Sequence, residues 1–238
     1  MADMQQTIKK GEIIGFNPVF LPHCQSEHFS PTFWQQNNSV IGSAAGRGTT
    51  HFIQSEQHKL VLRHYRRGGL IGKILNDQYL YLGLPSTRAF QEYLLLEKMK
   101  GMGLPAPTPV AYRVVKKGLY YHGDLITLKI PNAQDIHHVL QTRPLSEQEW
   151  RDIGNTIALF HQQQIYHHDL NIHNIMLDDA GKVWLIDFDK CAEKDGESWK
   201  QNNLDRLLRS LNKESNKMAN YHFEHKNWSL LIDGYKNH

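Results

Sequence analysis

The sequence predicts an α+β fold of two lobes with a cleft between them, in which a strand-rich first half precedes a helix-rich second half. Before about residue 130, most segments alternate apolar and polar residues as half-buried strands do. After Pro131, apolar residues recur mainly at helical spacing. A chain of 238 residues with 40% hydrophobic residues is long enough for two small lobes. We therefore expect one unit made of an N-terminal lobe, residues 1–130, and a C-terminal lobe, residues 131–238.

Turn-forming and capping residues place the elements of the first half. Residues 1 to about 38 have no clear period, and we expect an N-terminal extension or an irregular strand there. One helix follows Pro85 with a Ser-Thr start and ends at glycine, which are common helix boundaries. In chain order we expect strand, turn and strand over residues 39–53, a strand over 58–65, the helix over 86–103, and a strand pair over 111–115 and 119–130.

The second half begins with a clearly marked helix. Ser146 and Glu149 have the Ser-x-x-Glu spacing of a capping box. The apolar residues that follow, as far as Phe160, recur at helical spacing. Further along the chain we expect two short strands around a turn, over residues 174–179 and 182–188, and then a helix over 203–213.

Charge, cysteine content and hydropathy limit the class of protein. The formal net charge is only +3, so we expect no nucleic-acid partner. Cys24 and Cys191 lie far apart, which indicates free thiols in a reducing compartment. The apolar stretch near the N-terminus is broken by Glu12, Asn17 and Pro18, and no stretch reaches the ~18 apolar residues of a membrane helix. We expect a cytoplasmic protein.

The run HHDLNIHNIML, residues 167–177, places polar side chains in a loop before an apolar strand. A turn at residues 179–181 would pair this strand with the one that ends at Asp187, which brings Asn174 and Asp187 to the same end of a hairpin. Their oxygen atoms suit Mg²⁺, and Asp169 can accept the proton of an attacking hydroxyl. The alternative is that Asp and Asn simply favour turns, which explains any one of the three better than all three together.

The segments HHDLNIHNIML and VWLIDFD resemble the catalytic and metal-binding segments of the protein-kinase-like fold. The resemblance implies that Asp169 is the catalytic base and that Asn174 and Asp187 hold metal. The sequence departs from the pattern at His168, where that superfamily has an arginine that contacts a phosphorylated activation loop. It also lacks an Ala-Pro-Glu segment after Asp187. Both departures favour a small-molecule kinase over a protein kinase.

A kinase of this kind must bind nucleotide phosphates in its first lobe. The segment GSAAGRG supplies Gly42, Gly46 and Gly48 between two strands, where a backbone can approach phosphates closely. Because the pattern is not G-x-G-x-x-G, a tight hairpin is the alternative interpretation. A Walker-type G-K-[ST] is absent, which argues against a P-loop enzyme.

The next strand should present a cation to the α- and β-phosphates. Arg63 in KLVLRHY stands where lysine is usual, and arginine can bind phosphate bidentately. Lys59 shares its strand face and is the alternative. Glu92 is expected to pair with the cation, because it shares a helix face with apolar residues three, four and seven positions later. Glu97 is the second choice, and plain surface charges are the remaining interpretation.

A wider resemblance covers nearly all of the chain after about residue 30. It rests on LVLRHYRRGGLIGKI, STRAFQEYLLLEKMKGMGLPAPTPVAYRV, DLITLKIPNAQDI and NLDRLLRSLNK, which are similar to segments of the Kdo kinases. These enzymes phosphorylate the 3-deoxy-D-manno-octulosonic acid (Kdo) residue of the lipopolysaccharide inner core. The resemblance implies transfer of the γ-phosphate of ATP, with Mg²⁺, to a hydroxyl of Kdo-lipid A. It also implies peripheral contact with the cytoplasmic face of the inner membrane.

Two alternative functions stay open. One is a kinase for another acceptor, such as core heptose, an aminoglycoside or a protein hydroxyl. The other is a non-catalytic nucleotide-binding module, which the departures at Arg63 and His168 suggest and the intact Asp169 opposes.

Basic and imidazole side chains outside these motifs are candidates for contacts with the acceptor and within the catalytic loop. Two basic groups are candidates to face an anionic acceptor: Arg66 and Arg67 with Lys73, and Arg206 with Arg209. The alternative interpretation is that these side chains are solvated surface charges. The 15 histidines show no zinc-ligand spacing, even where three of them cluster in residues 167–173. We expect His167 to brace the catalytic loop through hydrogen bonds.

Overall fold

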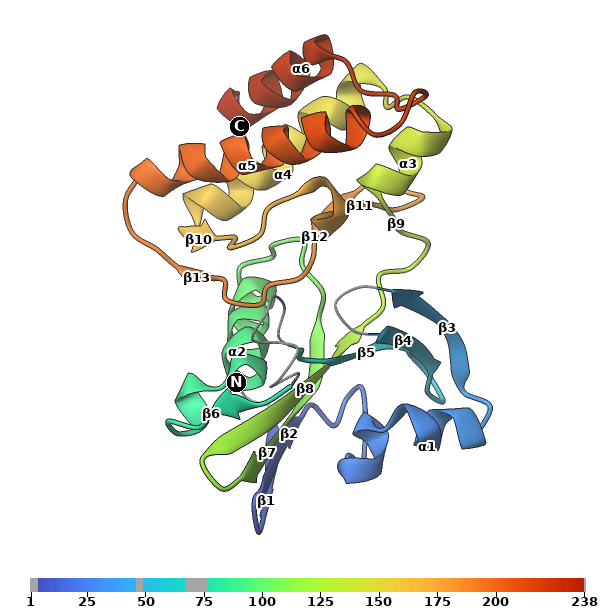
Figure 1. The fold of residues 1–238 in the computed structure, drawn as a ribbon, viewed down its shortest axis with the longest axis vertical. Helices are drawn as coiled ribbons and strands as arrows, with labels where there is room; N and C mark the ends of the chain where they lie inside the picture. Colours follow the sequence, from blue (N-terminus) through green and yellow to red (C-terminus); the bar gives the residue numbers. More distant parts are fainter. Residues whose placement is uncertain (1–3, 46–48, 67–76, 238) are drawn as a thin grey trace. The chain divides into compact units, whose positions relative to one another are not determined.

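The computed structural model describes residues 4–45, 49–66 and 77–237, which divide into two compact units. The first unit comprises residues 1–98 and 108–129, and the second comprises residues 99–107 and 130–238. Figure 1 shows an antiparallel sheet in the first unit and several helices in the second.

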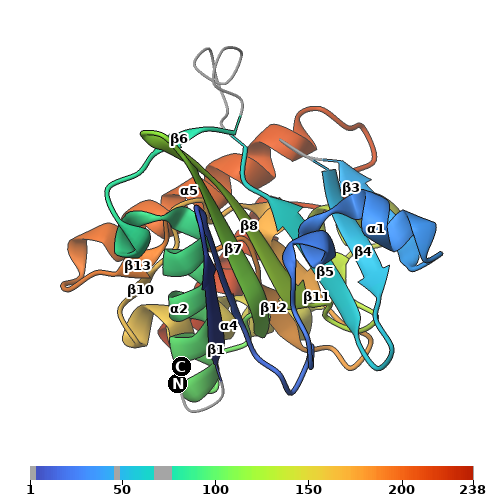
Figure 2. The same cartoon turned by 90° about the horizontal axis from the view of Figure 1, so that it is seen from below.

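The described strands of the first unit form one antiparallel sheet, seen from below in Figure 2. The pairs β1–β2, β3–β4, β4–β5 and β7–β8 join strands that follow one another in the chain, whereas β2–β7 and β5–β8 join distant segments, and β7 and β8 form the longest pair. Across the sheet the strands are β1 (Gln5–Lys9), β2 (Glu12–Phe16), β7 (Pro109–Lys117), β8 (Tyr120–Leu128), β5 (Lys59–His64), β4 (Thr49–Gln54) and β3 (Val40–Ala45), with β6 (Tyr79–Leu80) also paired to β8. The strands expected after residue 38 are confirmed.

The first 38 residues are more regular than expected. They contain the β1–β2 hairpin, a 3-10 turn η1 (Ser26–Phe29) and a short helix α1 (Pro31–Gln36). The sequence conceals the hairpin because all of β1 is exposed and therefore shows no apolar alternation. In β2, Gly15 makes room for the ring of Tyr112, since a Cβ at Gly15 would lie 2.1 Å from that ring.

The two faces of β5 and β8 carry different side chains. Helix α2 (Arg88–Gly101) covers one face, because a Cβ at Gly123 would lie 3.3 Å from Ala89 of that helix. Arg63 on β5 also reaches α2, through Glu92. Side chains alternate along a strand, so His64, next to Arg63, lies on the opposite face. The sheet can therefore carry two separate sites, one on each face.

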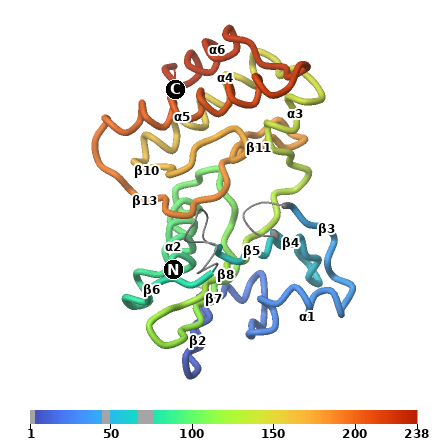
Figure 3. Tube along the Cα trace, in the orientation of Figure 1, coloured from blue at the N-terminus to red at the C-terminus, as the bar shows by residue number. Residues whose placement is uncertain are grey.

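The second unit is built mainly from helices, which Figures 1 and 3 follow from α3 to α6. The capping box expected at Ser146 and Glu149 is present at the start of α4. Two helices were not expected, α3 because it is short and α6 because a glycine interrupts its sequence. The elements are β9 (Gln134–Asp135), α3 (Ile136–Thr142), α4 (Glu147–Gln162), β10 (Ile165–Tyr166), η4 (Ile172–Asn174), β11 (Ile175–Leu177), β12 (Val183–Leu185), β13 (Ala192–Glu193), α5 (Ser198–Ser215) and α6 (His225–Lys236).

Two glycines let α4 and α6 pack backbone against backbone. A Cβ at Gly154 would lie 2.0 Å from the carbonyl oxygen of Leu231, and a Cβ at Gly234 would lie 2.1 Å from that of Arg151. Backbone atoms cannot rotate away as side chains do, so any larger residue must push the two helices apart.

Replacing Gly154 by alanine should therefore destabilise the protein by about 3 kcal/mol, the upper range for overpacking a core. Gly101 provides a matched control, because nothing lies within 4 Å of a Cβ added there. G101A should leave the free energy of unfolding unchanged or raise it by up to about 1 kcal/mol. Urea denaturation of both variants tests this, and equal stability of the two would contradict the close packing.

The described residues also bear on two expectations about thiols and membranes. Cys24 is buried, Cys191 is half-buried and neither forms a disulfide bond, as expected. Among the described helices, none combines the length and the apolar character that crossing a bilayer requires.

Candidate functional site

In the second unit, the hairpin of β11 and β12 positions two of the three polar residues identified from the sequence. The strands pair antiparallel, with Ile175 opposite Leu185. Beyond this pair, the amide of Ile186 donates to the carbonyl oxygen of Asn174 at 3.0 Å. The expected hairpin is therefore confirmed, and the backbones of Asn174 and Asp187 meet at the same end of it.

The loop before the hairpin brings Asp169 to the same end. The side-chain amide of Asn174, which is buried, donates to the carbonyl oxygen of Asp169 at 2.9 Å. Because the side-chain nitrogen of Asn174 makes this bond, the side-chain oxygen of Asn174 points away from the carbonyl group of Asp169. Asp187 has a φ of +64°, in the left-handed region that aspartate tolerates better than most residues. Such backbone strain occurs most often at functional sites.

His167 connects these segments from within the core. Its Nε2 donates to the carbonyl oxygen of Ile186 at 3.0 Å, and its Nδ1 accepts from the amide of Asp169 at 3.2 Å. These two bonds assign the proton to Nε2. Burial lowers the pKa of His167, which favours the neutral ring that this arrangement requires. The expectation that His167 braces the loop is confirmed.

Asn203 on α5 fixes the backbone of His167 in turn, a contact that we did not predict. Its Nδ2 donates to the carbonyl oxygen of His167 at 3.0 Å, and its Oδ1 accepts from the amide of His167 at 3.3 Å. The sequence did contain a signal. Asn203 lies four residues from each of Trp199 and Leu207, so it interrupts a buried apolar stripe with a buried amide.

The ring of His161 lies beside this amide and makes folding sensitive to acid. Its Nδ1 lies 2.9 Å from the hydroxyl of Tyr235, and its Nε2 lies 3.4 Å from Oδ1 of Asn203. Burial lowers the pKa of His161 from its ordinary value of 6.5 to about 4. Between these values the unfolded chain binds a proton that the folded chain does not, so the stability that His161 contributes is complete above pH 6.5 and is lost as the pH falls toward 4.

Acidification across this window should cost on the order of 3 kcal/mol of stability through His161, and the lowered pKa of His167 adds to the loss in the same direction. Urea denaturation near pH 7 and near pH 4 measures the difference. His161→Gln should reduce it, whereas His138→Gln, at an exposed position on α3, should leave it as in the wild type. An unchanged difference in His161→Gln would contradict this assignment.

Arg206 on α5 contacts the proposed base directly. Its Nε donates to Oδ1 of Asp169 at 2.9 Å, and its Nη2 donates to the same oxygen. The side chain of Asp169 is 29% exposed and that of Arg206 is 46% exposed, so solvent reaches both groups. Arg206 was expected only as one member of a possible acceptor-facing pair, and its contact with Asp169 links α5 to the loop before β11.

The first unit contains the expected ion pair between β5 and α2. Nη2 of Arg63 donates to Oε1 of Glu92, whose other oxygen accepts from the hydroxyl of Tyr65 at 2.5 Å. Glu92 is buried, and the Arg63 side chain is 25% exposed. Lys59, the alternative cation, is exposed at the start of the same strand. The pairing of Arg63 with Glu92 is thus present, and its binding of a nucleotide stays a prediction.

The predicted glycine segment is only partly described. Gly42 lies inside β3 rather than in the connecting turn, and a Cβ there would lie 3.3 Å from the Phe52 ring. Its position differs from the expectation because the strand continues to Ala45. Gly46 and Gly48 lie outside the described residues, as do Arg67 and Lys73 of the basic segment.

The donor atoms define what this arrangement can do. The amide oxygen of Asn174 and the carboxylate of Asp187 are hard oxygen ligands of the kind that Mg²⁺ prefers. The Asp169 carboxylate is accessible enough to accept a proton from a hydroxyl. Between Asp187 and α5 the chain is short and contains only the two-residue strand β13, which pairs with β10, so it leaves no long activation segment.

The fold is protein-kinase-like. A solved structure, described as a co-crystal of WbdD and the kinase inhibitor LY294002, matches 83% of this chain with a TM-score of 0.50 and 15% sequence identity. This chain spans 45% of the WbdD chain, and the likeness concerns the fold alone. The expected α+β kinase-like fold class is confirmed.

The sequence then defines the family. The chain belongs to the lipopolysaccharide kinase (Kdo/WaaP) family, whose profile matches residues 31–235. It is 48% identical to a 3-deoxy-D-manno-octulosonic acid kinase of Vibrio cholerae over 227 residues, 94% of each chain. The kinase of the same name from Haemophilus influenzae is 48% identical over 240 residues, 98% of this chain and 99% of the relative. The expected class of enzyme, a phosphotransferase, is confirmed.

Proposed function

We propose that this protein transfers the γ-phosphate of ATP to a hydroxyl of Kdo in the lipopolysaccharide inner core, with Kdo-lipid A as acceptor. The observation that carries the proposal is near full-length similarity, at 44–48% identity, to relatives named 3-deoxy-D-manno-octulosonic acid kinase. The polar network around Asp169 supports the same reaction from chemistry, because it presents a proton acceptor beside two oxygen ligands for a metal ion.

In this proposal Asp169 accepts the proton of the attacking Kdo hydroxyl, whose oxygen forms a bond to the γ-phosphorus while ADP leaves. Asn174 and Asp187 would hold Mg²⁺, which when bound neutralises charge on the phosphate oxygens. His167 holds the loop at Asp169 and the chain at Ile186 together through its two hydrogen bonds to backbone atoms. Precise placement of the base and the ligands is what makes proton acceptance efficient.

The first unit contributes the nucleotide-binding groups of the proposal. Arg63 would bind the α- and β-phosphates, since a guanidinium can donate two parallel hydrogen bonds to phosphate oxygens. Glu92 and Tyr65 support this role by fixing the guanidinium of Arg63: Arg63 donates to one oxygen of Glu92, and the hydroxyl of Tyr65 donates to the other. Gly42, Gly46 and Gly48 would let the backbone approach the phosphates.

Arg206 is proposed to orient the base. Its two hydrogen bonds to one oxygen of Asp169 fix the orientation of the carboxylate. R206A should lower kcat roughly 10- to 100-fold, the usual effect of removing a group that orients a functional ligand, with little change in ATP affinity.

The matched control for R206A is R209A, one turn further along α5 at an exposed position. Steady-state transfer rates of the two variants should differ clearly, with R209A close to the wild type. Equal losses in both would favour the interpretation of the two arginines as an acceptor-facing pair.

Another acceptor is the second candidate, because the kinase chemistry described above does not depend on Kdo. The short segment between Asp187 and α5 favours a small-molecule acceptor over a protein. Transfer rates should be compared for Kdo-lipid A, a heptosylated core, an aminoglycoside and a serine peptide. Preference for any acceptor other than Kdo-lipid A would refute the proposed specificity while leaving the kinase assignment intact.

We also propose that the protein works at the cytoplasmic face of the inner membrane as a peripheral protein. Leu80, Leu82 and Leu119 are 53%, 73% and 73% exposed at the edge formed by β6 and the β7–β8 turn. The exposed Lys116 and Lys117 precede this turn, and cations beside apolar side chains suit an anionic lipid surface. Flotation with anionic vesicles should carry the protein, and failure to float with them would exclude this attachment.

A further inference from the structure

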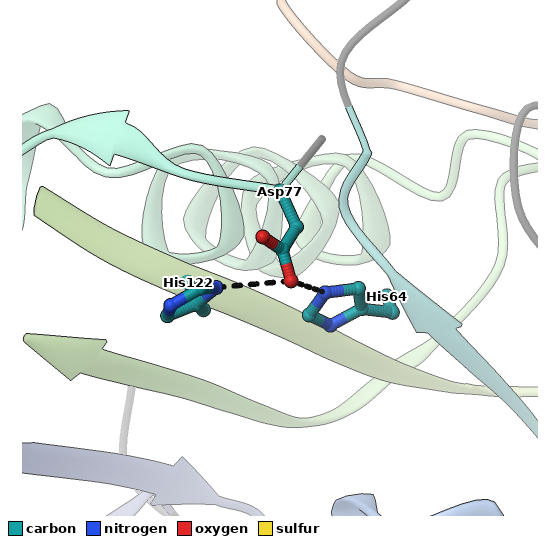
Figure 4. Close-up of side chains that lie close together, drawn as sticks. All are labelled: His64, Asp77 and His122. Atoms are coloured by element: carbon teal, nitrogen blue, oxygen red, sulfur yellow. Dashed lines mark hydrogen bonds and ion pairs between the residues drawn. The ribbon is translucent and has the colours of Figure 1, made fainter. Parts of the chain in front are cut away.

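Three side chains from separate parts of the first unit converge on the sheet face opposite α2, as Figure 4 shows. Nε2 of His64 lies 3.2 Å from Oδ2 of Asp77, and Nδ1 of His122 lies 3.1 Å from the same oxygen. The three donor atoms all lie within 4.8 Å of one another. His64 ends β5, His122 lies on β8, and Asp77 precedes β6.

These separations are close to those between the ligands of a bound metal ion. Nitrogen and oxygen ligands of zinc sit about 2.0–2.2 Å from the ion, which places neighbouring ligand atoms of a tetrahedral site about 3.3 Å apart. None of the three side chains is fully exposed, since His64 is 29% exposed, His122 16% and Asp77 35%. The site is thus partly shielded and remains accessible to an ion.

A second layer of contacts orients His64 as a ligand. Its Nδ1 lies 2.6 Å from Oδ1 of Asp124, a carboxylate that is 1% exposed. The other oxygen of Asp124 accepts from Nε of Arg113 at 2.8 Å, which fixes the carboxylate in place. A histidine that donates through one ring nitrogen to a carboxylate presents the lone pair of the other nitrogen outward, as histidine ligands of metals do.

We propose that His64, Asp77 and His122 bind a divalent transition-metal ion of the zinc type. Two imidazoles and one carboxylate suit such an ion, whereas Mg²⁺ and Ca²⁺ prefer oxygen ligands throughout. The site is separate from the residues proposed to hold Mg²⁺, which belong to the second unit. Its three ligands leave room for a water molecule or another small ligand on the ion.

The ion would join Asp77 to the central strands of the sheet. His64 pairs directly with Asp124 across β5 and β8, and His122 lies two residues before Asp124 on β8. Three ligands from three segments therefore connect the chain before β6 to the strand that presents Arg63 on its other face. Binding of the ion should stabilise the first unit and hold β5 in place.

A second cluster of possible metal ligands among the described residues is a weaker candidate for a metal site. His137, His173 and Glu214 also lie close enough to share an ion. Both oxygens of Glu214, however, accept from the ammonium of Lys217, at 2.9 and 3.0 Å. A cation already neutralises that carboxylate, so this cluster serves as the control.

Titration of the metal-free full-length protein with Zn²⁺, followed by calorimetry and elemental analysis, tests the proposal. The wild type should bind one Zn²⁺ per chain at this site, and millimolar Mg²⁺ should not displace it. Asp77→Asn and His122→Ala should each weaken binding at least 100-fold. Asp124→Asn should weaken it roughly 10- to 100-fold, as loss of a second-layer partner does. His173→Ala should bind as the wild type does.

The melting temperature gives an independent readout that does not rely on activity. Zn²⁺ should raise it for the wild type and for His173→Ala, and should not raise it for Asp77→Asn, which keeps the size of the side chain. Two results would overturn the proposal. One is the absence of stoichiometric Zn²⁺ binding by the wild type, which would leave Asp77 held by its direct contacts with His64 and His122. The other is Zn²⁺ binding that Asp77→Asn and His122→Ala leave unchanged.

Discussion

Asp169→Asn is expected to lower kcat for phosphate transfer by about 10²–10⁴-fold, the usual contribution of a general base. An asparagine oxygen can still accept from Arg206, so the loop should keep its structure while losing the group that takes the proton. ATP binding, measured by calorimetry, should stay within about twofold of the wild type. The comparison isolates proton acceptance from nucleotide binding.

The control for this variant is Asp233→Asn, which removes a carboxylate from an exposed position on α6. It should transfer phosphate at the rate of the wild type. If Asp169→Asn did the same, Asp169 would not be the base, although the family and the fold would stand.

Asp187→Asn is expected to lower kcat on the order of 10³-fold at a fixed Mg²⁺ concentration, because metal stabilisation of the transferring phosphate is worth several kcal/mol. Removing the charge should weaken Mg²⁺ binding, so higher Mg²⁺ should recover part of the rate. The φ of +64° at this position suits asparagine as well as aspartate, so the backbone should not change.

Asp195→Asn, in the exposed segment before α5, is the matched control for Asp187→Asn. Rates measured across a range of Mg²⁺ concentrations should shift for Asp187→Asn alone. A loss of rate that is the same at all Mg²⁺ concentrations would argue that Asp187 acts other than as a metal ligand.

The parts of the site that the sequence revealed are those that lie within one short stretch. Asp169, Asn174 and Asp187 belong to one loop and one hairpin, so spacing and strand pairing predict that they meet. The Arg63–Glu92 pair was also accessible, because strand alternation and helix periodicity each define a face. Hydrophobic patterning predicted the long elements in the same way.

The parts that the sequence concealed depend on tertiary contacts between distant segments. Arg206 reaches Asp169 only because α5 packs beside the catalytic loop, where Asn203 anchors it to His167. The cluster of His64, Asp77 and His122 needs β5, β8 and the chain before β6 to converge. No local spacing encodes such a cluster, which is why the sequence shows no zinc-ligand spacing there.

The measurement that tests the account most directly is the mass of Kdo-lipid A after incubation with the protein, ATP and Mg²⁺. We expect one added phosphate, located on the Kdo sugar by fragmentation, with the wild type and almost none with Asp169→Asn over the same time. An unchanged acceptor mass, under conditions in which the wild type demonstrably binds ATP, would contradict it.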